Sequence, residues 1–452
     1  MSNNQHLSRG LKNRHVQLLA IGGAIGTGLF LGSGISIHLA GPSILFAYII
    51  TGIICFLVMR ALGEVLLSNL NHHSFVDFVQ DYFGPRAAFV TGWTYWFCWI
   101  CLAIADLTAI GLYVQFWLPN IAQWVPTLIA LIILFAMNLM TVKIFGEMEF
   151  WFALIKVIAI LSLIVIGTFM IIKGFSTDAG ISSFSNLWSH GGWFPNGTEG
   201  FILSFQMVVF AFTGIELVGL TAGETENPQV VLPKAINNIP IRIIIFYVGA
   251  LVVIMSIYPW NAINPEKSPF VQVFAAVGIT AAASIVNFVV LTSAASACNS
   301  GIFSTSRMTY SLAKERNAPA FMKKLNARHI PSNATIFSAI AIFVSVILNY
   351  IMPEGIFILI TSISTFCFIY IWAMMVLCHL KYRKTNSRLA AKSKFKMPFY
   401  PVANYIILAF FIFVLVVLSL NEETRVALFV TPVWFIMLEV FYSIKSLASP
   451  HK

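Results

Sequence analysis

Charged side chains are scarce in this sequence, and that scarcity sets the class of protein. Only 10% of the 452 residues are Asp, Glu, Lys or Arg, whereas 59% are hydrophobic. Soluble domains carry roughly 25% charged residues, so water is not the solvent for most of this surface. In lipid the backbone must satisfy its own hydrogen bonds, as a helix or a closed barrel. The apolar runs extend over about 20 residues, which predicts an all-α integral membrane protein.

Several kinds of chemistry lack the residues they would need. The predicted spans contain no H-E-x-x-H or G-x-S-x-G motif and no aspartate pair at catalytic spacing, so we do not expect an enzyme. Cys98 and Cys101 form a C-x-x-C without a second pair or a histidine cluster, which favours packing over metal binding. We expect no cofactor, no metal and no nucleic-acid partner. Nothing resembles the selectivity filter of a channel.

Apolar runs and their breakers predict about twelve membrane spans, read in a window of about 19 residues. They cover residues 16–38, 42–68, 87–117, 124–142, 150–173, 200–222, 240–262, 280–312, 333–351, 355–381, 403–421 and 426–446. Residues 1–15 are polar and basic and show no cleavable signal peptide, so the first span is expected to serve as an uncleaved insertion signal.

The basic residues predict the orientation of these spans. They gather in three segments: Arg9, Lys12 and Arg14; Lys314, Arg316, Lys323, Lys324 and Arg328; and Lys381, Arg383, Lys384, Arg388, Lys392, Lys394 and Lys396. Twelve spans place all three segments on one side of the membrane. The excess of cations on cytoplasmic loops therefore predicts cytoplasmic termini, in a bacterial inner (plasma) membrane.

Two of the spans are unusually rich in glycine. The first span has Gly22, Gly23, Gly26, Gly28, Gly32 and Gly34, and the sixth has Gly214 and Gly219 around Glu216. Each glycine costs a helix about 1 kcal/mol against alanine, so the clusters predict interrupted helices. Small-residue packing faces are the alternative, and Gly22–Gly26 fits that spacing.

The two interruptions lie five spans apart, as in an inverted repeat whose broken helices meet at the membrane midplane. We expect a tail at residues 1–15 and a transporter core at 16–381, with repeats at 16–173 and 200–381. Residues 382–452 would add a loop, two further helices and a short tail.

An interrupted helix can hold a zwitterion. Its half-helix ends carry partial charges of roughly ±0.5, which lipid does not screen. Amides near Gly26, Thr27 and Gly28 would suit a carboxylate, and carbonyls near Ala211 to Gly214 would suit an ammonium. An α-amino acid carries both groups on one carbon.

Long segments of the chain resemble a known family. They are IGGAIGTGLFLGSG at 21–34, GWTYWFCW at 92–99, FGEMEFWFALIKV at 145–157, FAFTGIELVG at 210–219, ETENPQVVLPKAI at 224–236 and NSGIFSTSRM at 299–308. They are similar to the amino acid transporter family of the amino acid–polyamine–organocation superfamily. Within it, LTSAASACNSGIFSTSRM at 291–308 and NPEKSPFVQVF at 264–274 resemble the proton symporters of D-serine, D-alanine and glycine.

The resemblance implies a five-plus-five inverted-repeat fold of the LeuT-like type, with two additional carboxy-terminal helices. It implies that Gly26, Thr27 and Gly28 hold the substrate carboxylate and that Ala211, Phe212 and Gly214 line the ammonium side. The expected activity is proton-coupled import of small neutral amino acids, such as D-serine, D-alanine and glycine, by alternating access. Another neutral amino acid, such as proline, asparagine or a branched-chain one, is the alternative. A transport-like sensor is a further one, although the tails are short.

Ionisable residues inside the spans are functional candidates, because burying a charge in lipid is costly. The resemblance places Lys156 where related proton-coupled carriers have an amine in place of a sodium ion; snorkelling is the alternative. Ser296 or Ser300 would be its partner. Glu216 is expected to take part in protonation or to cap the broken backbone, and Asp106 to face the interior for coupling or a structural network.

A further pair lies near the end of the second span. Arg60 and Glu64 are four residues apart, which predicts an ordinary helix-surface ion pair.

Overall fold

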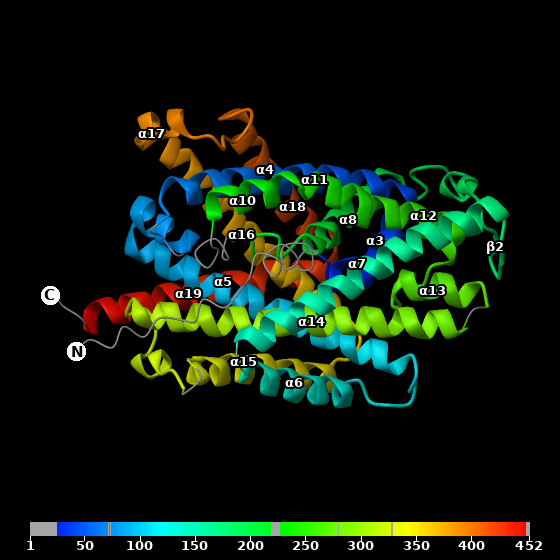
Figure 1. Cartoon of the computed structure of the whole chain (residues 1–452), viewed down its shortest axis with the longest axis horizontal. Helices are drawn as coiled ribbons and strands as arrows, with labels where there is room; N and C mark the ends of the chain where they lie inside the picture. Colours follow the sequence, from blue (N-terminus) through cyan, green and yellow to red (C-terminus); the bar gives the residue numbers. More distant parts are fainter. Residues whose placement is uncertain are drawn as a thin grey trace.

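The chain folds into a bundle of helices that run roughly along one axis (Figure 1). The computed structural model describes residues 25–70, 72, 74–140, 142–217, 227–278, 280–326 and 329–448. The helices are α2 (Thr27–Phe30), α3 (Gly32–Ala40), α4 (Ile44–Ser68), α5 (Phe75–Gln115), α6 (Trp124–Asn138), α7 (Val142–Lys173), α8 (Gly197–Ala211), α10 (Pro228–Asn237), α11 (Ile239–Arg242), α12 (Ala250–Ile257), α13 (Pro269–Ala276), α14 (Thr280–Lys314), α15 (Ser332–Ile351), α16 (Ile356–Thr385), α17 (Ser387–Lys392), α18 (Val402–Leu420) and α19 (Glu422–Ala448). Short elements join them: η1 (Gly41–Ser43), η2 (Phe184–Leu187), the π-helix η4 (Ile243–Gly249), η5 (Trp260–Ala262), η6 (Ala320–Lys323) and the two-residue strands β1 (Ser176–Thr177) and β2 (Gly180–Ile181).

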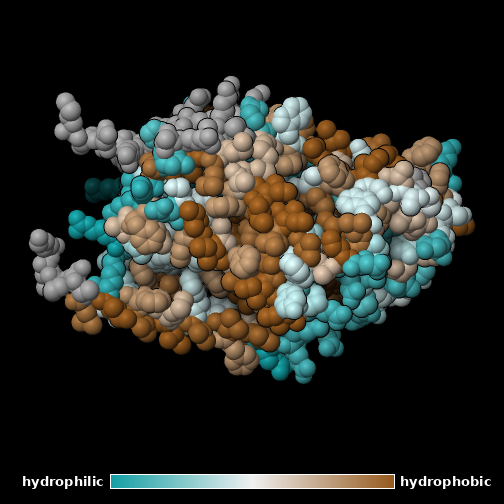
Figure 2. All heavy atoms as spheres, turned by 90° about the horizontal axis from the view of Figure 1, so that it is seen from below, coloured by the Kyte–Doolittle hydropathy of each residue, from teal (hydrophilic) through white to brown (hydrophobic). Residues whose placement is uncertain are grey.

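The predicted fold class is confirmed. Within the described residues, nine helical stretches are long and apolar enough to cross a membrane, and α6 and α8 are shorter apolar helices. The first of the nine, Gly32–Ser68, contains both α3 and α4, which Gly41 separates with a φ of 59°. The described helices thus agree with about twelve spans. In the view of Figure 2 a broad hydrophobic band covers the middle of the molecule, with hydrophilic residues toward both ends.

The boundaries of several spans differ from the prediction, and the third and seventh spans begin earliest relative to it. α5 begins at Phe75, where Ser74 caps the helix, and continues through a break at Gly84, whose φ is 86°, before Pro85. The seventh span begins at Pro228 with α10, well before residue 240. Both extensions are polar enough to lie outside a hydropathy window, so their helical conformation depends on caps and tertiary contacts.

α7 shows how a span divides between lipid and bundle. Trp151, Ile158, Val165 and Ile172 are all exposed and recur every seven residues. Glu149, Lys156, Leu163 and Met170 recur at the same spacing and are all buried. Seven residues are nearly two helical turns, so each set forms one stripe. One face of α7 therefore meets lipid, whereas Glu149 and Lys156 face the interior of the bundle.

α14 lies at the centre of the bundle, where it packs against α2, α5, α6, α7 and α15. Its carboxy-terminal end, α17 and the carboxy-terminal end of α19 all lie at the same end of the molecule, on the left in Figure 1. Two of the predicted cation-rich segments are thus on one side. The third, with Arg9, Lys12 and Arg14, lies outside the described residues.

Candidate functional site

The first helix interruption lies at Gly26. This residue is extended, with φ −131° and ψ −162°, and α2 begins directly after it at Thr27. The Gly26 carbonyl accepts hydrogen bonds from the amides of Leu29 and Phe30. The amides of Gly26, Thr27 and Gly28 therefore belong to the first turn, whose N–H groups have no partner within the helix. Gly22 and Gly23 lie outside the described residues.

The second interruption begins where α8 ends at Ala211. The chain continues in turns: the Ile215 amide donates to the Phe212 carbonyl, and the Leu217 amide donates to the Gly214 carbonyl. Gly214 has a φ of 91°, a conformation that favours glycine. Gly219 lies outside the described residues.

The two interruptions meet. A Cβ atom added to Gly28 would lie 2.5 Å from Cα of Ala211, and one added to Gly32 would lie 2.7 Å from Sδ of Met207. Only glycine allows the first half-helix to approach α8 this closely. At Gly26 the nearest atom would be Cβ of Ala297 at 4.0 Å, so that position has room. Gly28 and Gly32 thus allow close helix packing, whereas Gly26 lies at the interruption.

The residues predicted to line the ammonium side are buried, and two of them contact aromatic side chains. The Tyr247 hydroxyl donates to the Ala211 carbonyl at 3.1 Å. The Phe212 ring stacks on Tyr247 with 4.9 Å between centroids and lies 5.9 Å from the ring of Tyr48. Phe212 is therefore part of an aromatic cluster beside the break.

Asp106, on α5, is joined to the first interruption. The Thr27 hydroxyl donates to Oδ1 of Asp106 at 2.8 Å, and both side chains are buried. Oδ2 of Asp106 is buried and has no hydrogen-bond partner among the described residues. A buried carboxylate oxygen without a donor is costly, and such an atom is a candidate for binding a proton or a ligand.

Lys156 does not snorkel. Only 1% of this residue is exposed, so its ammonium stays inside the bundle and does not reach the membrane surface. Its charge acts on Glu149, on the same stripe of α7, and on Asp106. Among the described residues it is the only lysine or arginine that is fully buried.

Glu149 is a buried carboxylate that the sequence prediction missed. Ser296 donates to its Oε2 at 2.8 Å, and Asn299 donates to its Oε1 at 2.9 Å. Ser300, which follows Asn299 on α14, is also buried and lies near this carboxyl. The side-chain amide of Asn138 on α6 donates to Oδ1 of Asn299 at 2.7 Å. The position of Glu149, seven residues before Lys156, could have revealed this carboxylate, because that spacing puts both side chains on one helix face.

α14 connects these groups to the first interruption. The Ser293 hydroxyl donates to the Ile25 carbonyl at 3.4 Å, and Ala297 lies next to Gly26. Ser296 is one residue away and faces Glu149. The structure thus brings five predicted residues and three others into one polar region. We call this region the central cluster, and it consists of Gly26, Thr27, Asp106, Lys156 and Ser300 with Glu149, Ser296 and Asn299.

Glu216 lies at the second interruption and is buried. Tyr95 on α5 donates to its Oε1 at 3.4 Å, and Trp372 on α16 donates to its Oε2 at 3.3 Å. The backbone amides of Gly214 and Glu216 also act on this carboxyl.

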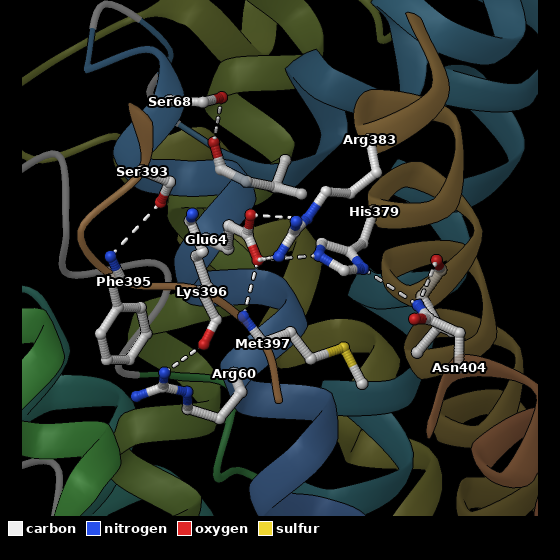
Figure 3. A network of polar contacts seen from close by, with 12 residues as sticks. Arg60, Glu64, Ser68, His379, Arg383, Ser393, Phe395, Lys396, Met397 and Asn404 are labelled. Carbon is white, nitrogen blue, oxygen red and sulfur yellow. Dashed lines mark hydrogen bonds and ion pairs between the residues drawn. The ribbon is translucent and has the colours of Figure 1, made fainter. Parts of the chain in front are cut away.

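A second polar region surrounds Glu64 on α4, and it corrects the expected pair (Figure 3). Arg383 forms an ion pair with Glu64, with Nε 2.8 Å from Oε1. The Met397 amide donates to Oε2 at 2.7 Å. Arg60 instead donates to the carbonyl of Lys396 and to Oδ1 of Asn237. The helix-surface pair was wrong because Glu64 points inward to distant partners.

His379 completes this region, which we call the Glu64 cluster. Its Nε2 lies 3.0 Å from Oε2 of Glu64, and Nδ1 lies 3.0 Å from the side-chain nitrogen of Asn404. The Asn404 amide donates to Nδ1, which leaves the ring proton on Nε2, facing the carboxylate. Sequence reasoning missed His379, because its partner is 315 residues away.

The two clusters differ in charge balance. Glu64 has a direct arginine partner, whereas Asp106 and Glu149 share a single lysine. The central cluster therefore has one buried carboxylate more than its cation can neutralise. Because an unpaired buried charge is costly, this region favours binding of a proton or of a cationic group.

Comparisons with known proteins identify the family. The family model "Amino acid permease" matches residues 15–446. The chain is 75% identical over 443 residues to "Uncharacterized transporter YdgF" of Bacillus subtilis (strain 168), covering 98% of this chain and 97% of that protein. It is 70% identical to "Amino-acid permease AapA" of the same strain, with 98% and 96% covered. It is 54% identical to "D-serine/D-alanine/glycine transporter" of Escherichia coli (strain K12), with 96% and 93% covered. The predicted resemblance is confirmed, and the chain belongs to the amino acid permease family, whose members are membrane transporters and not enzymes.

Proposed function

We propose that this permease is a proton-coupled symporter that imports small neutral amino acids by alternating access. The observation that carries the proposal is the charge imbalance of the central cluster, where Asp106 and Glu149 surround one buried lysine. A proton entering this cluster offsets the excess negative charge, and its release restores it. Thr27 links the cluster to the interrupted helix through its bond to Asp106.

The substrate site lies between the two interruptions. The first-turn amides of Gly26, Thr27 and Gly28 would hold the carboxylate, supported by the positive end of the half-helix. Ala211, Phe212 and Gly214 would line the ammonium side. The Ala211 carbonyl already accepts from Tyr247, so the ammonium would use its second lone pair or a neighbouring carbonyl.

D-Serine, D-alanine and glycine are the proposed substrates. The support is the relative named for these three amino acids, which is 54% identical over nearly the whole chain. A second relative, 44% identical, is named "Probable threonine/serine transporter YbxG". Both names specify small amino acids without a charged side chain.

The same proposal includes the topology. The cation-rich segments after α14 and α16 lie at one end of the bundle, which supports a cytoplasmic location for that end and for both termini. Repeats at residues 16–173 and 200–381 would each contain one interrupted span.

The test is uptake of labelled glycine, D-alanine, D-serine and L-alanine into proteoliposomes, under an inward proton gradient and then under a sodium gradient. We expect glycine, D-alanine and D-serine to accumulate with the proton gradient alone. Uptake of threonine or another neutral amino acid in their place would overturn the substrate. Accumulation driven only by sodium would overturn the coupling.

Two glycine variants test the location of the site. Gly26→Ala has room for its methyl group, so it should fold and bind substrate several-fold more weakly if the carboxylate approaches there. Gly28→Ala places a methyl group against the Ala211 backbone and should abolish transport. Unchanged substrate affinity in folded Gly26→Ala would contradict the site.

A further inference from the structure

Every charged side chain in the segment between α16 and α18 is a lysine or an arginine. Residues 381–401 contain seven cations and no carboxylate: Lys381, Arg383, Lys384, Arg388, Lys392, Lys394 and Lys396. The other basic segment at this end includes Glu315. Two of the seven cations have protein partners, because Arg383 pairs with Glu64 and Lys381 donates to the Tyr82 carbonyl. The other five are exposed and form no ion pair with the described residues.

The backbone of this segment is fixed on the bundle. The Met397 amide is bound by Glu64, and the Lys396 carbonyl accepts from Arg60. Asn386 donates to the Tyr82 hydroxyl at 3.0 Å. Ala390, Phe395 and Met397 are buried. The free cations therefore extend from an ordered platform and have less conformational entropy to lose on binding than those of a flexible tail.

The platform projects sideways from the bundle. In Figure 1, α17 lies beyond α4 and α10, at the end where α14 and α19 terminate. A segment that leaves a membrane bundle laterally at its end lies over the headgroups of the neighbouring lipids, and not over the bundle itself.

Exposed apolar side chains accompany the cations. Leu389 is 49% exposed, between Arg388 and Lys392, and Phe399 is 80% exposed after Lys396. Large apolar groups beside lysines and arginines are the combination that partitions into a bilayer interface. Cations near an anionic leaflet contribute roughly 1 kcal/mol each.

We propose that residues 384–399, the basic platform, bind the headgroups of anionic phospholipids in the adjacent leaflet. Leu389 and Phe399 enter the interface, and Lys384, Arg388, Lys392, Lys394 and Lys396 contact lipid phosphates. The inference is independent of the transported substrate; the proposed topology only identifies the leaflet as cytoplasmic. Because Met397 and Arg383 are bonded to Glu64, the bound lipid would also hold the Glu64 cluster in place.

A single label can report on this contact. All six native cysteines are buried, so the exposed Ala391→Cys offers a selective site for an environment-sensitive fluorophore. The full-length labelled protein is reconstituted into phosphatidylcholine vesicles with increasing fractions of phosphatidylglycerol. We expect a blue shift that grows with phosphatidylglycerol and is reversed by high salt.

Matched charge variants complete the test. Arg388→Gln/Lys392→Gln/Lys394→Gln should weaken the response roughly a hundredfold, at roughly fivefold per cation, so that no shift remains in the accessible range. Arg316→Gln/Lys323→Gln/Lys324→Gln removes the same charge from the other basic loop and should leave the shift intact. An equal shift in pure phosphatidylcholine, or equal losses in both variants, would overturn the proposal. The readout needs no transport, so failure of the symport proposal would not affect it.

Discussion

The Glu64 cluster and the central cluster bury similar groups in different ways. Glu64 is met by a guanidinium, an imidazole and a backbone amide from two other segments of the chain. Asp106 has one hydroxyl donor, and its second oxygen has no hydrogen-bond partner among the described residues. Both regions are inside a membrane protein, where each uncompensated charge is costly.

The difference separates a structural role from the proton-coupling role that we propose. A carboxylate with a direct arginine partner has little to gain from another proton, so the Glu64 cluster holds α4, α16 and the chain before α18 together. A cluster with more carboxylates than cations gains from an additional proton, which is the basis of the coupling role that we propose for it. The following variants would break or sharpen this contrast.

Arg383→Met should have the largest effect, on stability. It leaves Glu64 buried without its arginine partner, which typically costs about 3–5 kcal/mol. We expect a much lower unfolding temperature in detergent, with unchanged substrate affinity in the protein that remains folded. The double variant Glu64→Gln/Arg383→Met should recover part of the loss. A stable variant that has lost coupling would reverse the assignment of the two clusters.

Lys156→Met should abolish proton-driven accumulation while leaving exchange. Removing the cluster's cation should lower net uptake about a hundredfold, or about 2.7 kcal/mol. Net uptake and counterflow in the same proteoliposomes separate the two activities. Full concentrative uptake by this variant would contradict a coupling role for Lys156.

Glu149→Gln keeps the shape of the side chain and removes its charge. Asn299 can still donate to the amide oxygen, and the Ser296 hydroxyl can accept from the amide nitrogen, so the protein should fold. We expect net uptake to fall about tenfold and to depend less on the proton gradient. Ser296→Ala, which removes one hydrogen bond to this carboxyl, serves as the milder control. If uptake by Glu149→Gln kept its original dependence on the proton gradient, Glu149 would have no part in coupling, and Lys156 and Asp106 would be the remaining candidates.

Thr27→Val should have the smallest effect. It removes the hydroxyl that donates to Asp106, leaving that carboxylate without its hydrogen bond at a cost of about 1–3 kcal/mol. We expect a several-fold weaker apparent affinity for substrate, because Thr27 is one of the three residues proposed to hold the substrate carboxylate. Thr27→Ser retains the hydroxyl and should behave nearly as the original protein. Equal effects of both substitutions would mean that packing, and not the hydrogen bond, matters here.

Some of the site could be predicted because its signal is local. The glycine clusters around Gly26 and Gly214 break helix propensity within a few residues, and the interruptions lie where they do. Lys156 is conspicuous in an apolar span, and the stripes of α7 explain why it faces inward. Glu149 lies seven residues before Lys156, so the same spacing could have placed it on the inner face of α7. The proposed role of each residue is still a prediction to be tested.

The Glu64 cluster could not be predicted in this way. His379 and Arg383 are 315 and 319 residues from Glu64 along the chain, and no periodic pattern relates residues at such separations. The four-residue spacing of Arg60 and Glu64 indicated a pair that does not form, because tertiary partners compete successfully for both side chains.

The sequence by itself determined the membrane class, the twelve spans and the two interrupted helices, because lipid leaves the backbone few options and glycine acts locally. The tertiary structure decided which buried charges meet. α14 brings Glu149 beside the first interruption, and the chain before α18 returns to Glu64. Those pairings depend on how helices pack, and packing brings together residues that no local pattern relates.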